Sequence, residues 1–123
     1  DAARAIGVDP ARIVKSLVFE VDGHIVVALL AGSDRLEESR LAESLGGAVA
    51  TKADALRVRE ATGFDVGGVP PFGFGTDVPS FMDESLVTQP SVWAAAGTPL
   101  DMFEVETASL VRLSGAEVVR LRA

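Results

Sequence analysis

The sequence predicts an α/β (α+β) fold in which helices flank one mixed β-sheet. Two observations carry this prediction: an Asp-Gly dipeptide joins two β-rich runs, and two amphipathic helical segments separate those runs from further strands. These elements do not alternate strictly, as they would in a parallel βαβ array. With 123 residues, 48% of them hydrophobic, the chain is long enough for one core, so residues 1–123 are predicted to form a single domain.

The first predicted elements are a short helical turn and a β-hairpin. Asp9 followed by Pro10 is a helix-start signal, but within a few residues the pattern changes to the β-rich run 14–21. Asp22-Gly23 separates this run from the segment 24–31, which is the strongest short-range hairpin signal. Because the second arm is apolar almost throughout, we expect it to be a central strand covered on both faces.

Two amphipathic helices are predicted next. Residues 34–45 place leucines among charges at helical spacing, and Gly46-Gly47 supplies a stop. The second helix is predicted to begin at Thr51, with Asp54 three residues on as in a capping box, and to run to Gly63.

The segment 64–75 (FDVGGVPPFGFG) is predicted to be a loop with specified backbone angles, because it is too rich in Gly and Pro for a strand or a helix. Regular structure is predicted again after it. The expected elements are strands at 78–82, 91–96 and 102–105, a short helix at 107–113 capped by Thr107, a stop at Gly115 and a final strand at 117–121.

The composition excludes several kinds of chemistry. The chain has no cysteine and one histidine, which excludes disulfides, thiolate sites and histidine-rich metal centres, so we expect neither a metal nor a cofactor. A net charge of −7 disfavours a general nucleic-acid coat, although it allows a few cations at the mouth of one pocket. No apolar run reaches the roughly 20 residues that span a bilayer, so we expect a cytoplasmic protein without a membrane partner. The chain starts at Asp1 inside an apparent helix, and we expect an N-terminal piece to be missing.

Lys15 is the first candidate functional residue. It shares the strand alternation of Leu17 and Phe19, where an unpaired buried charge would be unfavourable. One interpretation is an edge-strand lysine whose stem packs while its ammonium reaches water. The other is a cation held in a pocket to meet a phosphate or to polarise a carbonyl.

The Gly- and Pro-rich loop is the second candidate. Glycines allow the backbone to approach a ligand closely and prolines fix the shape of that approach, so its N–H groups could receive a developing oxyanion. Pro70 and Pro71 have no N–H, which leaves as donors Gly68, Val69, Phe72 or Gly73. A rigid connection between a helix and a strand is an equally good interpretation.

Other polar residues carry weaker signals. Asp83 before Glu84 could belong to a paired-carboxylate site, but a turn or helix cap is the simpler interpretation. Lys52, Arg57 and Arg59 could border a site, although charged helix faces are usually only solvated.

Taken in order, these features resemble a known family. VKSLVF (14–19), a hairpin, two helices, ATGFDVGGVPPFG (61–73) and VWAAAG (92–97) are similar to the YbaK/ProX family of aminoacyl-tRNA editing domains, related to the domain inserted in some bacterial prolyl-tRNA synthetases. The specific marks are Lys15 and the Gly-x-x-x-Pro motif from Gly67 to Pro71, and the likeness runs from about Ala3 to Leu121.

The resemblance implies a curved, mostly antiparallel mixed sheet and hydrolysis of the ester between an amino acid and the terminal adenosine of a mischarged tRNA. Lys15 and Gly67 are then expected to be catalytic, with Lys15 holding the terminal nucleotide and the loop backbone positioning the aminoacyl carbonyl and a water. The residues expected to bind substrate are Ser16, Gly68, Val69, Pro70, Pro71, Phe72, Gly73 and Asp83. The implied partners are the acceptor 3′ end of tRNA and prolyl-tRNA synthetase, and the protein is expected to be a monomer or a homodimer.

Two departures bear on the substrate. Pro70 stands where many relatives carry Ser, Thr or Cys, and no histidine lies at 95–99, where the branch acting on alanyl-tRNA has one. We therefore expect a relative of the branch that resembles cysteinyl-tRNA(Pro) deacylases. The alternatives are a noncatalytic module that binds an acceptor stem or a synthetase, and a small-molecule ester hydrolase or ligand-binding domain that uses the same pocket.

Overall fold

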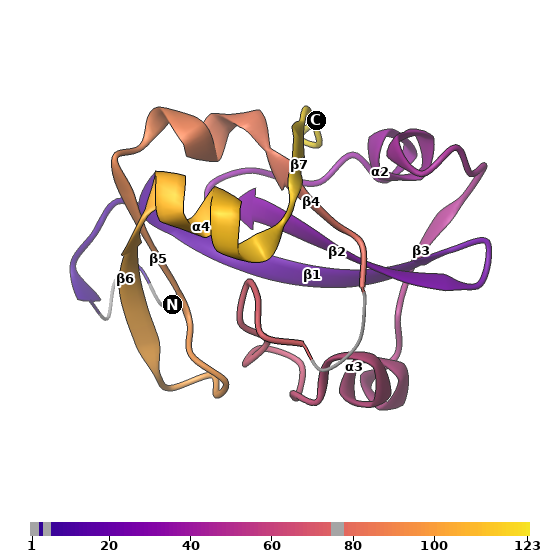
Figure 1. The fold of residues 1–123 in the computed structure, drawn as a ribbon, viewed down its shortest axis with the longest axis horizontal. Helices are drawn as coiled ribbons and strands as arrows, with labels where there is room; N and C mark the ends of the chain where they lie inside the picture. Colours follow the sequence, from indigo (N-terminus) through magenta and orange to yellow (C-terminus); the bar gives the residue numbers. More distant parts are fainter. Residues whose placement is uncertain (1–2, 4–5, 75–77) are drawn as a thin grey trace.

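In the computed structural model, which describes residue 3 and residues 6–74 and 78–123, seven strands form one mixed sheet (Figure 1). The strands are β1 (Ile13–Val21), β2 (His24–Ala31), β3 (Ala50–Lys52), β4 (Ser80–Asp83), β5 (Ser91–Ala95), β6 (Met102–Glu106) and β7 (Glu117–Val119). Three α-helices, α2 (Glu38–Ser44), α3 (Ala55–Thr62) and α4 (Thr107–Ser114), and two 3₁₀-helices, η1 (Pro10–Arg12) and η2 (Glu84–Thr88), complete the described elements.

The strand order is β6-β5-β1-β2-β4-β7, and β3 also pairs with β1. The β1–β2, β1–β3 and β5–β6 pairs are antiparallel, whereas the β1–β5, β2–β4 and β4–β7 pairs are parallel. The two longest pairings, β1–β2 and β5–β6, are both antiparallel. The predicted mixed sheet with flanking helices is therefore confirmed.

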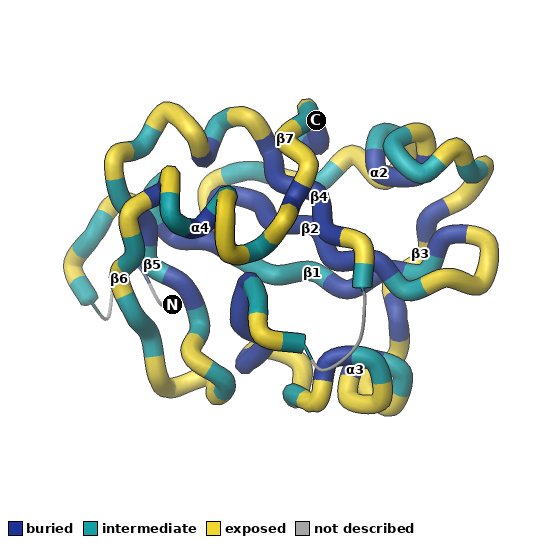
Figure 2. The backbone as a smooth tube through the Cα atoms, viewed as in Figure 1, coloured by how far each residue is buried: buried dark blue, intermediate teal, exposed yellow. Residues whose placement is uncertain are grey.

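The hairpin of β1 and β2 is also confirmed. Val21 pairs with His24, so that two residues make the turn, and both have positive φ, 50° at Asp22 and 84° at Gly23. Such a turn matches the right-handed twist of the strands it joins, which is why Asp-Gly predicts it. β2 lies between β1 and β4, and Figure 2 shows most of it as buried. From Val26 onward no residue of β2 is more than 2% exposed.

Apolar side chains pack on both faces of the sheet. On one face Val14, Val18 and Leu29 pack in one cluster with Val58 of α3 and Leu110 of α4. On the other face, alternate strand residues such as Phe19 and Leu30 pack with Leu41 of α2. None of the described helices has the length and apolarity that crossing a membrane would require.

The prediction for the first amphipathic helix was too long. Helix α2 begins at Glu38, not at residue 34, and ends as predicted before Gly46, whose φ is 69°. The preceding residues are extended because Leu36 forms a β-bridge with Arg122 and the Glu37 N–H donates to the Leu121 carbonyl at 2.8 Å. This pairing comes from the distant C-terminal tail, so local spacing gives no sign of it.

The predicted start of the second helix at Thr51 was wrong. Thr51 lies in β3, paired with Glu20, and α3 begins only at Ala55. Asp54 is the N-cap, since its Oδ1 accepts a hydrogen bond from the Arg57 N–H at 2.8 Å. The predicted end is confirmed, because Gly63 caps the helix with a φ of 83°.

The C-terminal elements were predicted well except at their ends. β4 begins at Ser80 rather than at residue 78, and Gly75 of the predicted loop lies outside the described residues. Helix α4 is confirmed, but Glu106 occupies the cap position, and the buried Thr107 hydroxyl has no hydrogen-bond partner among the described residues. β7 stops at Val119, two residues short of the predicted end.

Candidate functional site

The candidate site lies at a gap in the sheet. The edge of β1 opposite β2 is shared by two strands: β5 pairs with Ile13 and Val14, and β3 pairs with residues 19–21. Neither register reaches the stretch from Lys15 to Val18. A cavity of about 300 Å³ occupies this gap, at the small end of the range for ligand sites.

Four segments far apart in sequence line the cavity. Figure 1 shows the segment 64–74 beside the middle of β1, between α3 and the β5–β6 hairpin. The walls are mainly apolar, with the polar groups of Lys15, Ser16 and Lys52 among them. The lining residues are Ile13, Val14, Lys15, Ser16, Leu17, Val18, Phe19, Lys52, Ala53, Val58, Val66, Gly67, Val69, Ala95, Pro99 and Met102.

Lys15 is half-buried, and its Nζ donates a hydrogen bond of 2.5 Å to the backbone carbonyl of Asp34. A carbonyl accepts this bond without cancelling the charge, and an ammonium has two further N–H groups to offer. No carboxylate of the described residues lies within the 4.0 Å of an ion pair from Lys15. The structure therefore places an unpaired cation in the wall of the cavity.

Ser16 and Lys52 stand beside this cation. The hydroxyl of the half-buried Ser16 has no hydrogen-bond partner among the described residues, and its backbone pairs with β2 but with neither β3 nor β5. Lys52, at the end of β3, is exposed and lines the cavity without an ion pair to any described residue. Both residues are thus available to a ligand.

The glycine-rich loop enters the site through a tight turn. The Gly68 N–H donates to the Asp65 carbonyl at 3.0 Å, and Gly67, the third residue of the turn, has a φ of 88°, as a type II turn requires. The prediction that the Gly68 N–H could serve as a donor is therefore wrong, because the turn already uses it. Gly67 and Val69 line the cavity, and their N–H groups have no acceptor among the described residues.

The rest of the loop supports this turn and does not line the cavity. Pro70 and Pro71 are buried, and the Phe72 ring packs edge-on against Phe103 of β6 with a centroid separation of 5.9 Å. Gly73 is exposed with a φ of 91°. Of the ten predicted site residues, four line the cavity: Lys15, Ser16, Gly67 and Val69.

Asp83 lies away from the cavity, at the end of β4, and its side chain is fully buried. Its Oδ1 accepts from the backbone N–H groups of Leu121 and Arg122 at 2.7 and 2.9 Å, and its Oδ2 accepts from the Arg122 guanidinium at 3.1 Å and the Ser85 N–H at 3.0 Å. These bonds confirm the interpretation of Asp83 as a cap and show that it also clamps the C-terminal tail.

The pKa of Asp83 reflects this clamp. Burial alone would raise it, but hydrogen bonding from Ser85 and from the backbone of Leu121 and Arg122 outweighs burial and lowers the pKa to about 2. The Ser85 hydroxyl itself donates a hydrogen bond of 2.9 Å to Asp34 Oδ2. Asp83 therefore stays ionised throughout the neutral range.

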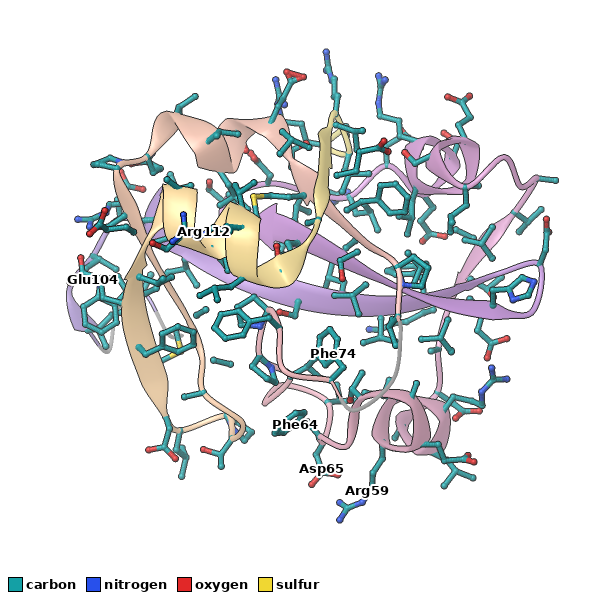
Figure 3. All side chains as sticks on the ribbon, viewed as in Figure 1. Arg59, Phe64, Asp65, Phe74, Glu104 and Arg112 are labelled. Atoms are coloured by element: carbon teal, nitrogen blue, oxygen red, sulfur yellow. The ribbon has the colours of Figure 1, made fainter. Side chains whose placement is uncertain are left out.

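Of the cations that were expected to border the site, Lys52 alone lines it. Arg57 pairs with Glu20 at 3.1 Å, which ties α3 to β1. Arg59 pairs with Asp65 at 2.6 Å, and Figure 3 shows both at the periphery of the molecule. Sequence reasoning missed Pro99 and Met102, which the parallel pairing of β1 with β5 brings to the cavity without any local signal.

In the described part of the chain, no group of three or more His, Asp or Glu side chains is placed to hold a metal ion. The available chemistry there consists of cations, a serine hydroxyl and backbone N–H groups around an apolar cavity. This arrangement can orient a ligand and stabilise negative charge.

The fold and the site together define an aminoacyl-tRNA editing domain of the YbaK type. The chain belongs to this family, whose model matches residues 1–113. It is 32% identical over 117 residues to the uncharacterized protein YwhH of Bacillus subtilis, a match that covers 95% of the chain and 74% of YwhH.

Two further comparisons concern prolyl-tRNA synthetases. The chain is 41% identical over 76 residues to proline–tRNA ligase of Moorella thermoacetica, but the match covers 62% of the chain and only 13% of the ligase. A solved structure of a protein described as a candidate trans-editing enzyme for prolyl-tRNA synthetase superposes with a TM-score of 0.93 at 41% identity, covering 99% of this chain and 77% of that one.

Proposed function

We propose that this protein is a trans-editing deacylase that hydrolyses mischarged tRNA(Pro) carrying cysteine or another small noncognate amino acid. The observation that carries the proposal is the cavity at the gap beside β1, which is lined by Lys15 and by the part of the loop that contains Gly67 and Val69. Family membership and the likeness to a candidate trans-editing enzyme support the same activity.

In this proposal Lys15 and Lys52 hold the negatively charged 3′ end of the tRNA. The aminoacyl side chain enters the apolar part of the cavity, whose volume of about 300 Å³ favours small residues. Discrimination by such a pocket is modest, since one methylene changes binding by about 1–3 kcal/mol. Prolyl-tRNA synthetase, which makes the mischarged substrate, is the proposed partner.

The reaction itself needs neither a protein nucleophile nor a metal. Water adds to the ester carbonyl carbon, the bond to the ribose oxygen breaks, and that oxygen leaves with a proton, which yields free amino acid and tRNA. The N–H groups of Gly67 and Val69 are the proposed donors to the oxyanion, and the neighbouring ribose hydroxyl can assist the proton transfer. Ser16 is proposed to orient the water or the amino group of the substrate.

The test is deacylation of tRNA(Pro) charged separately with Cys, Ala, Ser and Pro. We expect rapid release of one noncognate amino acid by the native protein and a loss of at least about 100-fold in Lys15→Ala. Arg112→Ala is the matched control, because this arginine of α4 (Figure 3) is exposed, and its side chain forms a hydrogen bond to Ser109 and no ion pair with a described residue.

Two results would contradict the proposal. Release at the buffer rate for every amino acid would rule out tRNA(Pro) editing, and retained tRNA binding would then favour the noncatalytic module. Equal hydrolysis of a simple aminoacyl ester lacking the tRNA would instead favour a small-molecule esterase.

A further inference from the structure

The residue whose backbone carbonyl binds the cation of the cavity has a carboxylate side chain, and this carboxylate is held away from the cation. Lys15 donates to the backbone carbonyl of Asp34, whereas the side chain of the same Asp34 accepts a 2.9 Å hydrogen bond from the Ser85 hydroxyl through Oδ2. The Asp34 carboxylate and the Lys15 ammonium do not form an ion pair, although they belong to residues in direct contact.

Asp34 is held from two further directions. Its own N–H donates to the Ala31 carbonyl at 2.9 Å, at the end of β2. The residues after it are bound to the C-terminal tail by two backbone hydrogen bonds. The Ala123 N–H donates to the Arg35 carbonyl at 2.9 Å, and the Glu37 N–H donates to the Leu121 carbonyl at 2.8 Å. The carbonyl that receives Lys15 is therefore part of a fixed segment.

Ser85 is held in turn by the buried clamp. Its N–H donates to Asp83 Oδ2 at 3.0 Å, and Asp83 also binds the backbone of Leu121 and Arg122. A continuous set of hydrogen bonds thus runs from the C-terminal tail through Asp83, Ser85 and Asp34 to Lys15.

We propose that Asp34 and Ser85 are positioning residues for Lys15. The Asp34 carbonyl fixes the ammonium at the cavity, and Ser85 restrains the Asp34 carboxylate so that it does not neutralise the charge that the tRNA 3′ end must meet. A released carboxylate would compete with the anionic substrate for the same ammonium. This inference rests on the proposed function, because it assigns Lys15 to substrate binding.

The test measures KM and kcat separately on the mischarged tRNA(Pro) that the native protein hydrolyses best. Ser85→Ala is expected to raise KM about fivefold and to change kcat little, because a competing ion pair weakens ground-state binding. Adding Asp34→Asn to Ser85→Ala is expected to return KM to within about twofold of the native value, since a neutral amide cannot compete. Ser85→Thr, which keeps the hydroxyl, is expected to retain the native KM.

Thr88→Ala is the matched control. It removes a hydroxyl from the same 3₁₀-helix, where Thr88 Oγ1 donates to the Ser85 carbonyl at 2.7 Å, and it leaves the contact with Asp34 intact. Circular dichroism and urea denaturation establish that each variant is folded. Should Ser85→Ala unfold, Ser85→Cys preserves the side-chain volume with a weaker donor and is expected to raise KM about twofold.

Each outcome is informative. The positioning inference would be overturned if Ser85→Ala had the same KM as Thr88→Ala. It would also be overturned if adding Asp34→Asn to Ser85→Ala raised KM further instead of lowering it. If Ser85→Ala does not fold, a native KM in Ser85→Cys would overturn it. If Lys15→Ala has lost activity in the same assay, the proposed function survives that result. If Lys15→Ala is fully active, the assignment of Lys15 to the substrate fails instead.

Discussion

Gly68 packs directly against the backbone of Thr98, so that the glycine-rich loop and the β5–β6 turn meet without an intervening side chain. A Cβ atom added at Gly68 would lie 2.8 Å from the Thr98 Cα and 2.9 Å from the Gly97 carbonyl oxygen. Backbone atoms cannot give way as the end of a side chain can, so this contact sets the position of the loop above the cavity.

Gly68→Ala is therefore expected to displace the loop and to lower the free energy of unfolding by about 1–3 kcal/mol. Deacylation should fall with it, because Gly67 and Val69 move away from Lys15. Gly73→Ala is the control for the Cβ contact, because an added Cβ at Gly73 meets nothing within 4 Å. The φ of Gly73 is left-handed at 91°, unlike that of Gly68, so about 1 kcal/mol of backbone strain is expected with little loss of activity. Urea denaturation measures the stability of both variants, and the deacylation assay measures their activity. Equal losses of stability and activity in the two variants would show that the Thr98 contact is unimportant.

Asp83 predicts a particular acid sensitivity. Its pKa is lowered from 3.8 to about 2, so its ionised form stabilises the folded state fully above pH 3.8, and this stabilisation is lost as the pH falls through about 2. The contribution is about 2 kcal/mol. Asp83→Asn should remove this part of the pH dependence of unfolding between about pH 4 and pH 2. Glu60→Gln, at an exposed position of α3, should leave it unchanged; an unaltered profile in Asp83→Asn would contradict the clamp.

The corrected start of α3 can be tested by two single substitutions. Asp54→Ala removes the side chain that caps the helix and is expected to lower the free energy of unfolding by about 1 kcal/mol. Thr51→Ala changes an exposed position of β3 that caps nothing, and should change stability by less than about 0.5 kcal/mol. A larger effect at Thr51 than at Asp54 in thermal or urea denaturation would restore the helix start predicted from the sequence.

Val69 is expected to limit the size of the amino acid. It lines the cavity at 4% exposure, so Val69→Ala should widen the pocket and improve the hydrolysis of larger aminoacyl esters relative to small ones by roughly 10-fold or less. Val92→Ala truncates an equally buried valine that does not line the cavity, and should lower stability without altering the preference. The measurement is kcat/KM for a series of aminoacyl-tRNAs; identical preferences in both variants would exclude Val69 from selection.

Much of the fold could be predicted because its signals are local. Asp22-Gly23 specifies the hairpin through its own backbone angles, and Gly63 and Gly115 end helices through theirs. The misplaced boundaries arise where distant residues take over: Thr51 pairs with Glu20, and Leu36 pairs with Arg122. Such pairings leave no trace in a window of neighbouring residues.

The sequence indicated which residues belong to the site better than it indicated what each of them does. Lys15 stood out as a charge in an apolar strand, and the Gly and Pro content marked the loop. That the turn uses the Gly68 N–H, or that Pro70 and Pro71 are buried, depends on how the chain turns in three dimensions. Asp83 was noticed for its charge, yet its contact with the C-terminal tail spans nearly forty positions.

The gap between β3 and β5 determines where the cavity lies, whereas the side chains that line the cavity determine which ligand it selects. Because the cavity lies where neither β3 nor β5 pairs with β1, exchanging single side chains leaves the cavity where it is, whereas extending β3 and β5 toward each other along residues 15–18 would pair the open edge. The surrounding side chains, in contrast, can be exchanged one at a time. Descendants of one ancestral domain could in this way acquire new substrates by point mutation while the place of binding stays inherited.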